Sequence, residues 1–126
     1  HKLPFFRREG LLRENGFVLT EKSKNCLFLS TGNESIKHFF VKALIFKILR
    51  NRGREVGTEV EVNGGIVDVL DLSTMIAYEV ETKLTKEKIA EKASCLNGLR
   101  DVFFIDTAEV SNDLFEAEKY LREKIV

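Results

Sequence analysis

The alternation of apolar and polar residues predicts four strands from residue 54 onward. Residues 54–62, REVGTEVEV, alternate as a strand, and the Asn-Gly-Gly at 63–65 is typical of a tight hairpin turn. The segments IVDVLDL (66–72) and IAYEVET (76–82) predict two further strands. The segment DVFFID (101–106) predicts a buried fourth strand because four of its six residues are apolar.

Three segments have helical spacing of their apolar residues. Residues 31–53, TGNESIKHFFVKALIFKILRNRG, predict a long helix with a polar N-terminus and basic residues in the last turn. Residues 85–99, TKEKIAEKASCLNGL, predict a helix with lysines on one side and apolar residues on the other, namely Ile89, Ala93 and Leu96. Residues 111–125 predict a closing amphipathic helix that buries Leu114, Ala117 or Glu118, and Leu121.

From residue 33 the predicted order is α-β-β-β-α-β-α, which indicates an α/β fold with a central mixed sheet flanked by helices. A chain of 126 residues is long enough for one domain. Residues 33–126 would form its core. Residues 1–32 predict an extension packed on that core, made of a short helix over 5–15 and a hairpin over 17–30.

Acidic residues occupy alternate positions within the third predicted strand. Side chains two residues apart on a strand share one face, so Glu79 and Glu81 lie on the same side, together with Ala77 and Lys83. Two carboxylates about 7 Å apart repel by roughly 2–3 kcal/mol at an effective dielectric of about 20. On an open face water screens this repulsion, so an ordinary solvated face remains an alternative.

Asp68 occupies an apolar face of the preceding strand. Its neighbours on that face are Ile66, Leu70 and Leu72, where an ionised carboxylate is costly unless a cation or several donors satisfy it. A hairpin between the two strands would bring Asp68 close to Glu79. With Glu81 these acids would make a site for a hard divalent cation, which prefers oxygen ligands. A hydrogen bond from a backbone N–H or a nearby lysine is the alternative.

The long helix carries a polar stripe of Glu34, His38 and Lys42 at intervals of four residues. If this helix packs across the sheet, it can aim Glu34 at the same acids; an exposed polar face is the alternative. A phosphate backbone could be bound by lysines of this helix and of the lysine-rich stretch after the third strand, although a solvated face is the commoner explanation. These candidates are Lys42, Lys86, Lys88 and Lys92.

Composition limits the class of protein but does not indicate an activity. Apolar residues make up 44% and charged residues 32%, which is typical of soluble globular domains. Lys+Arg and Asp+Glu are balanced at 20 each, so a nucleic-acid partner must be inferred from a local patch. The absence of Gln and Trp, with much Lys and Glu, indicates a thermophile.

Location follows from the apolar runs and the cysteines. No run is long enough for a membrane span and no cleavable signal stands at the start, so we expect a cytoplasmic protein. Cys26 and Cys95 are then expected to be reduced and buried. Because the chain begins at His1 without an initiator Met, we expect the N-terminus to be a tag remnant.

The segments NESIKHFFVK, GGIVDVLDL and IAYEVETK together resemble the PD-(D/E)xK nuclease superfamily, which has the restriction-endonuclease-like fold. The resemblance is greatest to small archaeal proteins related to Holliday junction resolvases, and it covers residues 33 to about 107. The family's carboxylates correspond to Asp68 and Glu79, and Glu34 matches the acid often supplied by the first helix. Two positions depart from the pattern: Val67 replaces the Pro, and Glu81 replaces the Lys, for which Lys83 is a displaced substitute.

The resemblance implies a metal-dependent DNA endonuclease that hydrolyses phosphodiester bonds, of branched or foreign DNA. Mg²⁺, with Mn²⁺ as a substitute, would be held by Asp68 and Glu79. Glu81 would orient the attacking water or hold a second cation, and Lys83 would neutralise charge at phosphorus. No organic cofactor is expected, and cutting both strands would call for a homodimer. The alternatives are a catalytically inactive nuclease-fold module that binds DNA or protein, and a plain interaction domain with solvated acids.

Overall fold

The structure is a computed structural model that describes residue 13 and residues 36–62, 65–94 and 97–126. The predicted N-terminal helix and hairpin, apart from Arg13, lie outside the described residues. Glu34 and both cysteines, Cys26 and Cys95, also lie outside the described residues.

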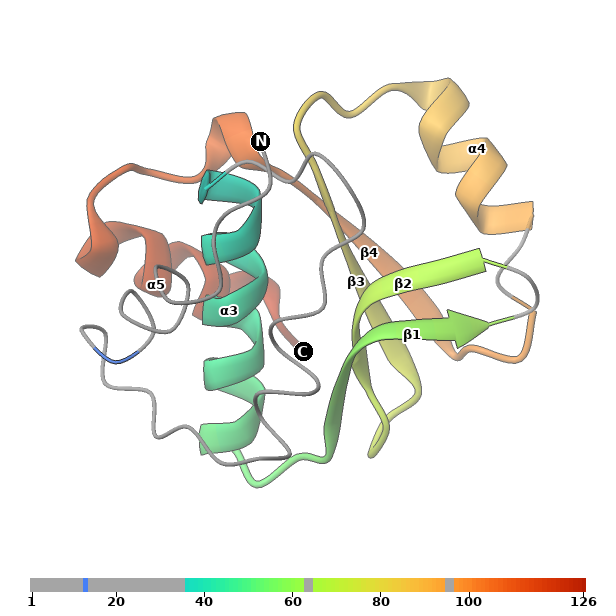
Figure 1. Cartoon of the computed structure of the whole chain (residues 1–126), viewed down its shortest axis with the longest axis horizontal. Helices are drawn as coiled ribbons and strands as arrows, with labels where there is room; N and C mark the ends of the chain where they lie inside the picture. Colours follow the sequence, from blue (N-terminus) through green and yellow to red (C-terminus); the bar gives the residue numbers. More distant parts are fainter. Residues whose placement is uncertain (1–12, 14–35, 63–64, 95–96) are drawn as a thin grey trace.

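The described part of the chain has a mixed α/β fold with a four-stranded mixed sheet and three α-helices (Figure 1). The strand order is β1-β2-β3-β4; β1, β2 and β3 are antiparallel, and β4 runs parallel to β3. The α/β prediction is therefore confirmed at this level. In chain order the elements are α3 (Ile36–Asn51), β1 (Val56–Val62), β2 (Gly65–Asp71), β3 (Ile76–Glu81), α4 (Lys86–Ser94), β4 (Asp101–Asp106), the 3-10 helix η1 (Thr107–Glu109) and α5 (Leu114–Lys124).

Two tight connections set the register of the first three strands. Val62 pairs with Gly65, so β1 and β2 form the hairpin that the Asn-Gly-Gly sequence predicts. A four-residue turn joins β2 to β3, and the N–H of Met75 donates to the carbonyl oxygen of Asp71 at 2.7 Å. Parallel strands need a crossover connection, and α4 lies in the one between β3 and β4.

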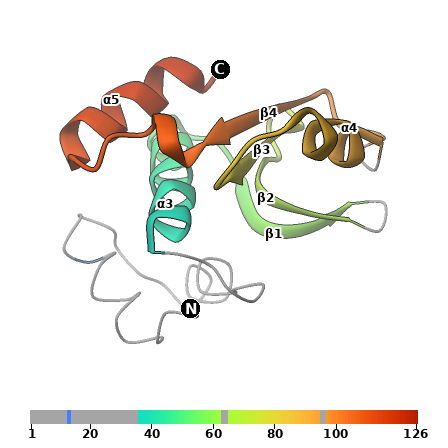
Figure 2. The same ribbon diagram turned by 90° about the horizontal axis from the view of Figure 1, so that it is seen from above.

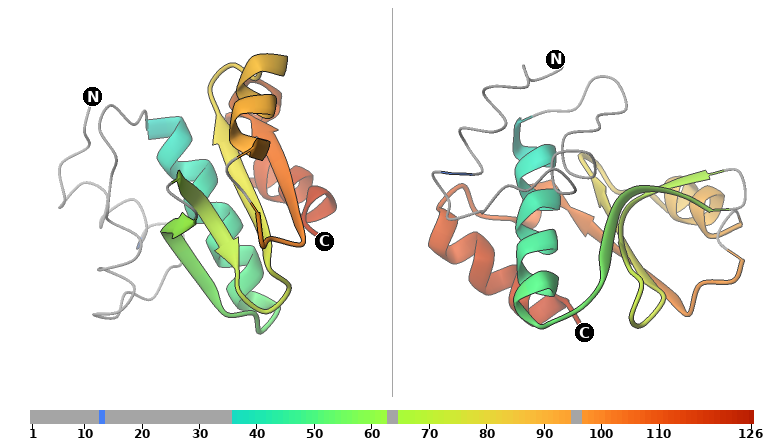
Figure 3. Two further views of the ribbon diagram at one scale, coloured as in Figure 1. Left: turned by 90° about the vertical axis from the view of Figure 1, so that its right-hand side faces the viewer. Right: turned by 60° about the horizontal axis from the view of Figure 1, so that its bottom comes forward.

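The helices divide between two sides of the sheet (Figures 1 and 2). α3 and α5 lie together on one side, where Leu44, Leu49 and Leu121 are fully buried against the apolar residues of the strands. α4 lies on the other side, and the views in Figure 3 show the same separation. The strand residues in the core beneath α3 and α5 are Val56, Val69, Ile76, Tyr78, Val80 and Ile105.

α4 differs from its prediction, because none of its described side chains is buried. Ile89, expected on a buried apolar side, is 37% exposed, and Ala93 is also exposed. The helix instead turns Lys88 and Lys92 toward acidic groups of the sheet. In the described residues α4 therefore contacts the sheet through these two lysines, and its predicted apolar side is not buried.

The strand 101–106 and the last helix also differ from their predictions. β4 is an edge strand in which Ile105 is the one buried residue, because no other strand of the described residues pairs with its outer side. In α5, Ala117 and Leu121 are buried as predicted, but Leu114 is 39% exposed at the first turn. Asp113 caps this helix by accepting a hydrogen bond from the N–H of Glu116 at 3.0 Å.

Among the helices that the structure describes, none has both the length and the apolar character that crossing a membrane requires.

Candidate active site

Asp68 on β2 and Glu79 on β3 hold the two strands together through their side chains. Regular pairing of these strands runs from Asp71–Ile76 to Val69–Tyr78, and Asp68 and Glu79 are the next residues in that register. Glu79 Oε1 accepts a hydrogen bond from the N–H of Asp68 at 2.9 Å, and Asp68 Oδ2 accepts one from the N–H of Val80 at 2.7 Å. The predicted closeness of Asp68 and Glu79 is therefore confirmed.

Both acids are withdrawn from water. Glu79 is 2% exposed, and the side chain of Asp68 is 15% exposed. Burial raises the pKa of Glu79 to about 7, and the neighbouring charge of Asp68 adds to the rise. Burial also raises the pKa of Asp68, although the hydrogen bond from Val80 opposes this shift. The pair is therefore costly to ionise together near neutral pH without a cation beside it.

Cationic and polar groups approach the pair from both sides of the sheet. Lys92 Nζ on α4 lies 3.3 Å from Glu79 Oε2 and donates to the carbonyl oxygen of Ile66 at 2.7 Å. From α3, His38 Nε2 lies 2.6 Å from the carbonyl oxygen of Val80 and 3.9 Å from Asp68 Oδ2. These neighbours offset part of the negative charge of the two acids.

Lys42 and Glu59 form a buried ion pair beside this site. The Lys42 side chain is 6% exposed, so its placement does not suit the phosphate contact expected for it. Glu59 falls opposite Asp68 in the β1–β2 register and has a φ of 53°, a left-handed conformation that is uncommon for a residue with a side chain. Glu59 is one of the polar residues of the alternating segment 54–62, and nothing in that alternation indicates its burial.

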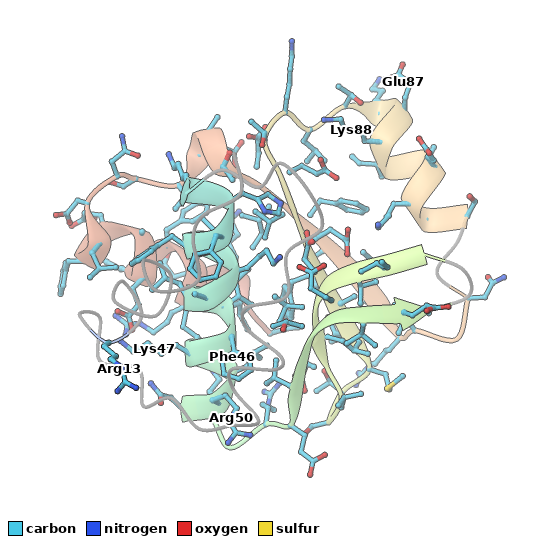
Figure 4. The ribbon with its side chains drawn as sticks, viewed as in Figure 1. Arg13, Phe46, Lys47, Arg50, Glu87 and Lys88 are labelled. Carbon is cyan, nitrogen blue, oxygen red and sulfur yellow. The ribbon has the colours of Figure 1, made fainter. Side chains whose placement is uncertain are left out.

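Glu81 and Lys88 form a second, more exposed contact. Glu81 Oε2 lies 3.5 Å from Lys88 Nζ, which also donates to the carbonyl oxygen of Lys83 at 2.7 Å. In Figure 4, Lys88 extends from α4 toward the chain leaving β3, whereas Glu87 points away from the sheet. Lys83 and Lys86 are exposed. A pocket of about 330 Å³ opens here, and it is lined by Gly65, Glu81, Lys88, Glu91 and Lys92.

The donor set suits a magnesium ion that is only partly held by protein. Within residues 36–62, 65–94 and 97–126, no three His, Cys, Asp or Glu side chains are grouped closely enough to hold a metal ion. The predicted three-acid cluster of Asp68, Glu79 and Glu81 is therefore not formed in the described structure. Mg²⁺, however, is usually bound by one or two carboxylates, with water and substrate phosphates completing the shell. Asp68 and Glu79 fit this pattern.

Comparison with known proteins adds no family to these observations. No family model matches the chain, and no curated protein or solved structure matches it.

Proposed function

We propose that this protein is a metal-dependent DNA endonuclease with a restriction-endonuclease-like core. The observation that carries the proposal is the pairing of Asp68 and Glu79 across adjacent antiparallel strands, buried and bonded to each other's strand. Two like charges so placed raise each other's cost of ionisation, and a divalent cation removes that cost. A purely structural role would be served better by one acid paired with one base.

In the proposed site Asp68 and Glu79 hold Mg²⁺, for which Mn²⁺ substitutes. What the bound ion supplies is charge that lowers the pKa of water and offsets charge building at phosphorus. The hydrogen bonds from the N–H groups of Asp68 and Val80 keep the carboxylates oriented before any substrate arrives. Glu81 borders the pocket beside them, where it can orient water or hold a second cation.

The proposed substrate is DNA, of branched or foreign origin. The 330 Å³ pocket is lined in part by Lys88 and Lys92, which can accept a phosphate between them, and Lys92 also contacts Glu79. Lys86, on the exposed surface of α4, is a further candidate contact to the phosphate backbone. Because one site cuts one strand, a homodimer would supply the second site needed for a double-strand cut.

The test is cleavage of supercoiled plasmid and of a labelled four-way junction with EDTA, Mg²⁺ or Mn²⁺. We expect cleavage only with a divalent ion, and we expect Asp68→Asn to reduce its rate by at least about a hundredfold, as loss of a principal charge-stabilising group does. Asp101→Asn is the matched control, since Asp101 is an exposed acid on the edge strand. Divalent-dependent cleavage that is equally fast with Asp68→Asn would contradict the proposal.

A catalytically inactive module that binds DNA or protein is the second candidate. The ammonium of Lys92 already faces Glu79, so an internal cation can offset one of the two negative charges without a metal. This candidate predicts that wild type binds the four-way junction equally well with EDTA and with Mn²⁺, and that no divalent ion raises its melting temperature. A melting shift with Mn²⁺ that depends on Asp68 would count against it.

A further inference from the structure

Lys92 occupies the one place where α4 reaches the two acids in the described structure. Its ammonium lies 3.3 Å from Glu79 Oε2 on β3 and donates to the carbonyl oxygen of Ile66 on β2 at 2.7 Å. The same side chain is 29% exposed, so it reaches the buried acids and solvent together. A cation in this position can contact a ligand that enters from outside.

α4 contacts β3 through two lysines. No residue described in α4 is buried, and Lys88 and Lys92 are one helical turn apart, with Glu81 and Glu79 as their respective partners. Both lysines line the 330 Å³ pocket beside the sheet. A ligand that binds the Glu79 carboxylate would therefore release the Lys92 ammonium from it. The released ammonium would lie at the edge of the pocket, which is large enough for a phosphate.

Other cations of the region are less suitable for contact with a substrate. Lys42 is 5% exposed and paired with Glu59, so reaching a ligand would mean breaking a buried ion pair. Lys83 follows the end of β3 on the exposed surface, and its carbonyl oxygen, not its ammonium, is the group that contacts Lys88. Lys92 combines contact with the carboxylate pair and access to the pocket.

We propose that Lys92, supplied by α4 and not by β3, is the catalytic lysine of this site. The proposal rests on the endonuclease function proposed above. When metal and DNA occupy the site, the Lys92 ammonium leaves Glu79 and contacts a non-bridging oxygen of the phosphate that is cut, where it offsets the charge that builds in the transition state. Water oxygen bonds to phosphorus, the bond from phosphorus to one sugar oxygen breaks, and a water proton ends on that oxygen. Lys92 keeps its protons throughout.

The experiment compares Lys92→Met, Lys92→Arg, Lys83→Met and Lys119→Met with wild type. Single-turnover cleavage of the labelled four-way junction is measured in Mn²⁺, binding of the junction is measured by anisotropy without metal, and the melting shift is measured with Mn²⁺ alone. We expect Lys92→Met to slow cleavage by at least about a hundredfold, the usual cost of removing a group that stabilises transition-state charge. Its junction binding and its Mn²⁺ melting shift should be kept, and Lys92→Arg should recover part of the rate.

Lys119→Met is the matched control because Lys119 is an exposed lysine of α5, on the other side of the sheet from α4. It should cleave at the wild-type rate, and Lys83→Met should cleave faster than Lys92→Met. Wild-type cleavage by Lys92→Met would overturn this inference alone, as would a loss confined to Lys83→Met. A slow Lys92→Met variant that has also lost the Mn²⁺ shift would show that Lys92 only maintains the site, and would overturn it too. If wild type cuts neither DNA probe, the endonuclease proposal fails and this inference fails with it.

Discussion

The strand β2 carries two acids, Asp68 at its middle and Asp71 as its last residue, and the two have opposite surroundings. Asp71 is completely buried, but Arg54 Nη1 lies 2.5 Å from its Oδ2 and the N–H of Ser73 donates to its Oδ1 at 3.0 Å. Asp68 lies beside a second acid, the buried Glu79, and each of these two carboxylates accepts a hydrogen bond from a backbone N–H of the other's strand. Asp71 therefore forms a satisfied ion pair, whereas Asp68 and Glu79 concentrate negative charge.

This contrast distinguishes a buried acid that stabilises the fold from acids that can bind a ligand. An acid paired with one base needs nothing further, and losing the base leaves a buried charge. Two acids that share one site resist ionisation until a cation arrives. The raised pKa values of Asp68 and Glu79, against the close contact of Asp71 with Arg54, express this difference.

Of the two acids of β2, Asp71 is where the larger effect on stability is expected. Arg54→Met should lower the free energy of unfolding by about 3 kcal/mol, because it leaves Asp71 charged and buried without its partner. Urea unfolding monitored by circular dichroism measures this. Asp68→Asn in EDTA at pH 8 should instead leave stability unchanged or raise it, by relieving repulsion with Glu79. Equal destabilisation by both variants would remove the contrast between the two acids.

The second prediction concerns pH, and its sign follows from the raised pKa of Glu79. Its folded-state pKa of about 7 exceeds the ordinary 4.5, so the folded protein binds more protons between these values. The stabilisation from this group is therefore present in full below about pH 4.5 and is lost as pH rises through 7, a change of about 3 kcal/mol at most. Chemical unfolding in EDTA between pH 5 and 8 measures it.

Glu79→Gln is the variant that isolates this titration from others in the protein. Its stability should decline less than that of wild type over the same pH range. A pH dependence identical to that of wild type would mean that Glu79 titrates normally in the folded state.

The third prediction adds metal to the same pair. An ion that binds only the folded protein stabilises it by about 2.7 kcal/mol at a hundredfold excess over its dissociation constant. We expect Mn²⁺ and Mg²⁺ to raise the melting temperature of wild type and of Arg54→Met, but not of Asp68→Ala. A shift that survives in Asp68→Ala would place the bound ion elsewhere.

The smallest effect is expected on the outer surface of α4. Lys86→Met should change the free energy of unfolding by less than about 0.5 kcal/mol, because Lys86 is exposed and the helix has no buried residue among those described. Leu44→Ala in α3, on the other side of the sheet, should cost about 2–5 kcal/mol because Leu44 is 1% exposed. Thermal unfolding of both variants compares how much the exposed surface of α4 and the buried face of α3 contribute to stability.

The sequence by itself determined the strands and the meeting of Asp68 with Glu79. Side chains alternate with a period of two, and a short turn allows little freedom in register, so the acid pair could be predicted from residues 66–82. The long helix over α3 and the α/β class followed in the same way from apolar spacing.

Only the tertiary structure decided which cations reach the pair. Lys42 and Lys92 had been grouped as surface lysines, yet one is buried against Glu59 and the other contacts Glu79. Apolar periodicity predicts how a helix lies only when its apolar side is buried, whereas the described residues of α4 contact β3 through ion pairs of Lys88 and Lys92. Such contacts depend on where whole elements come together in space, and local sequence patterns do not record that.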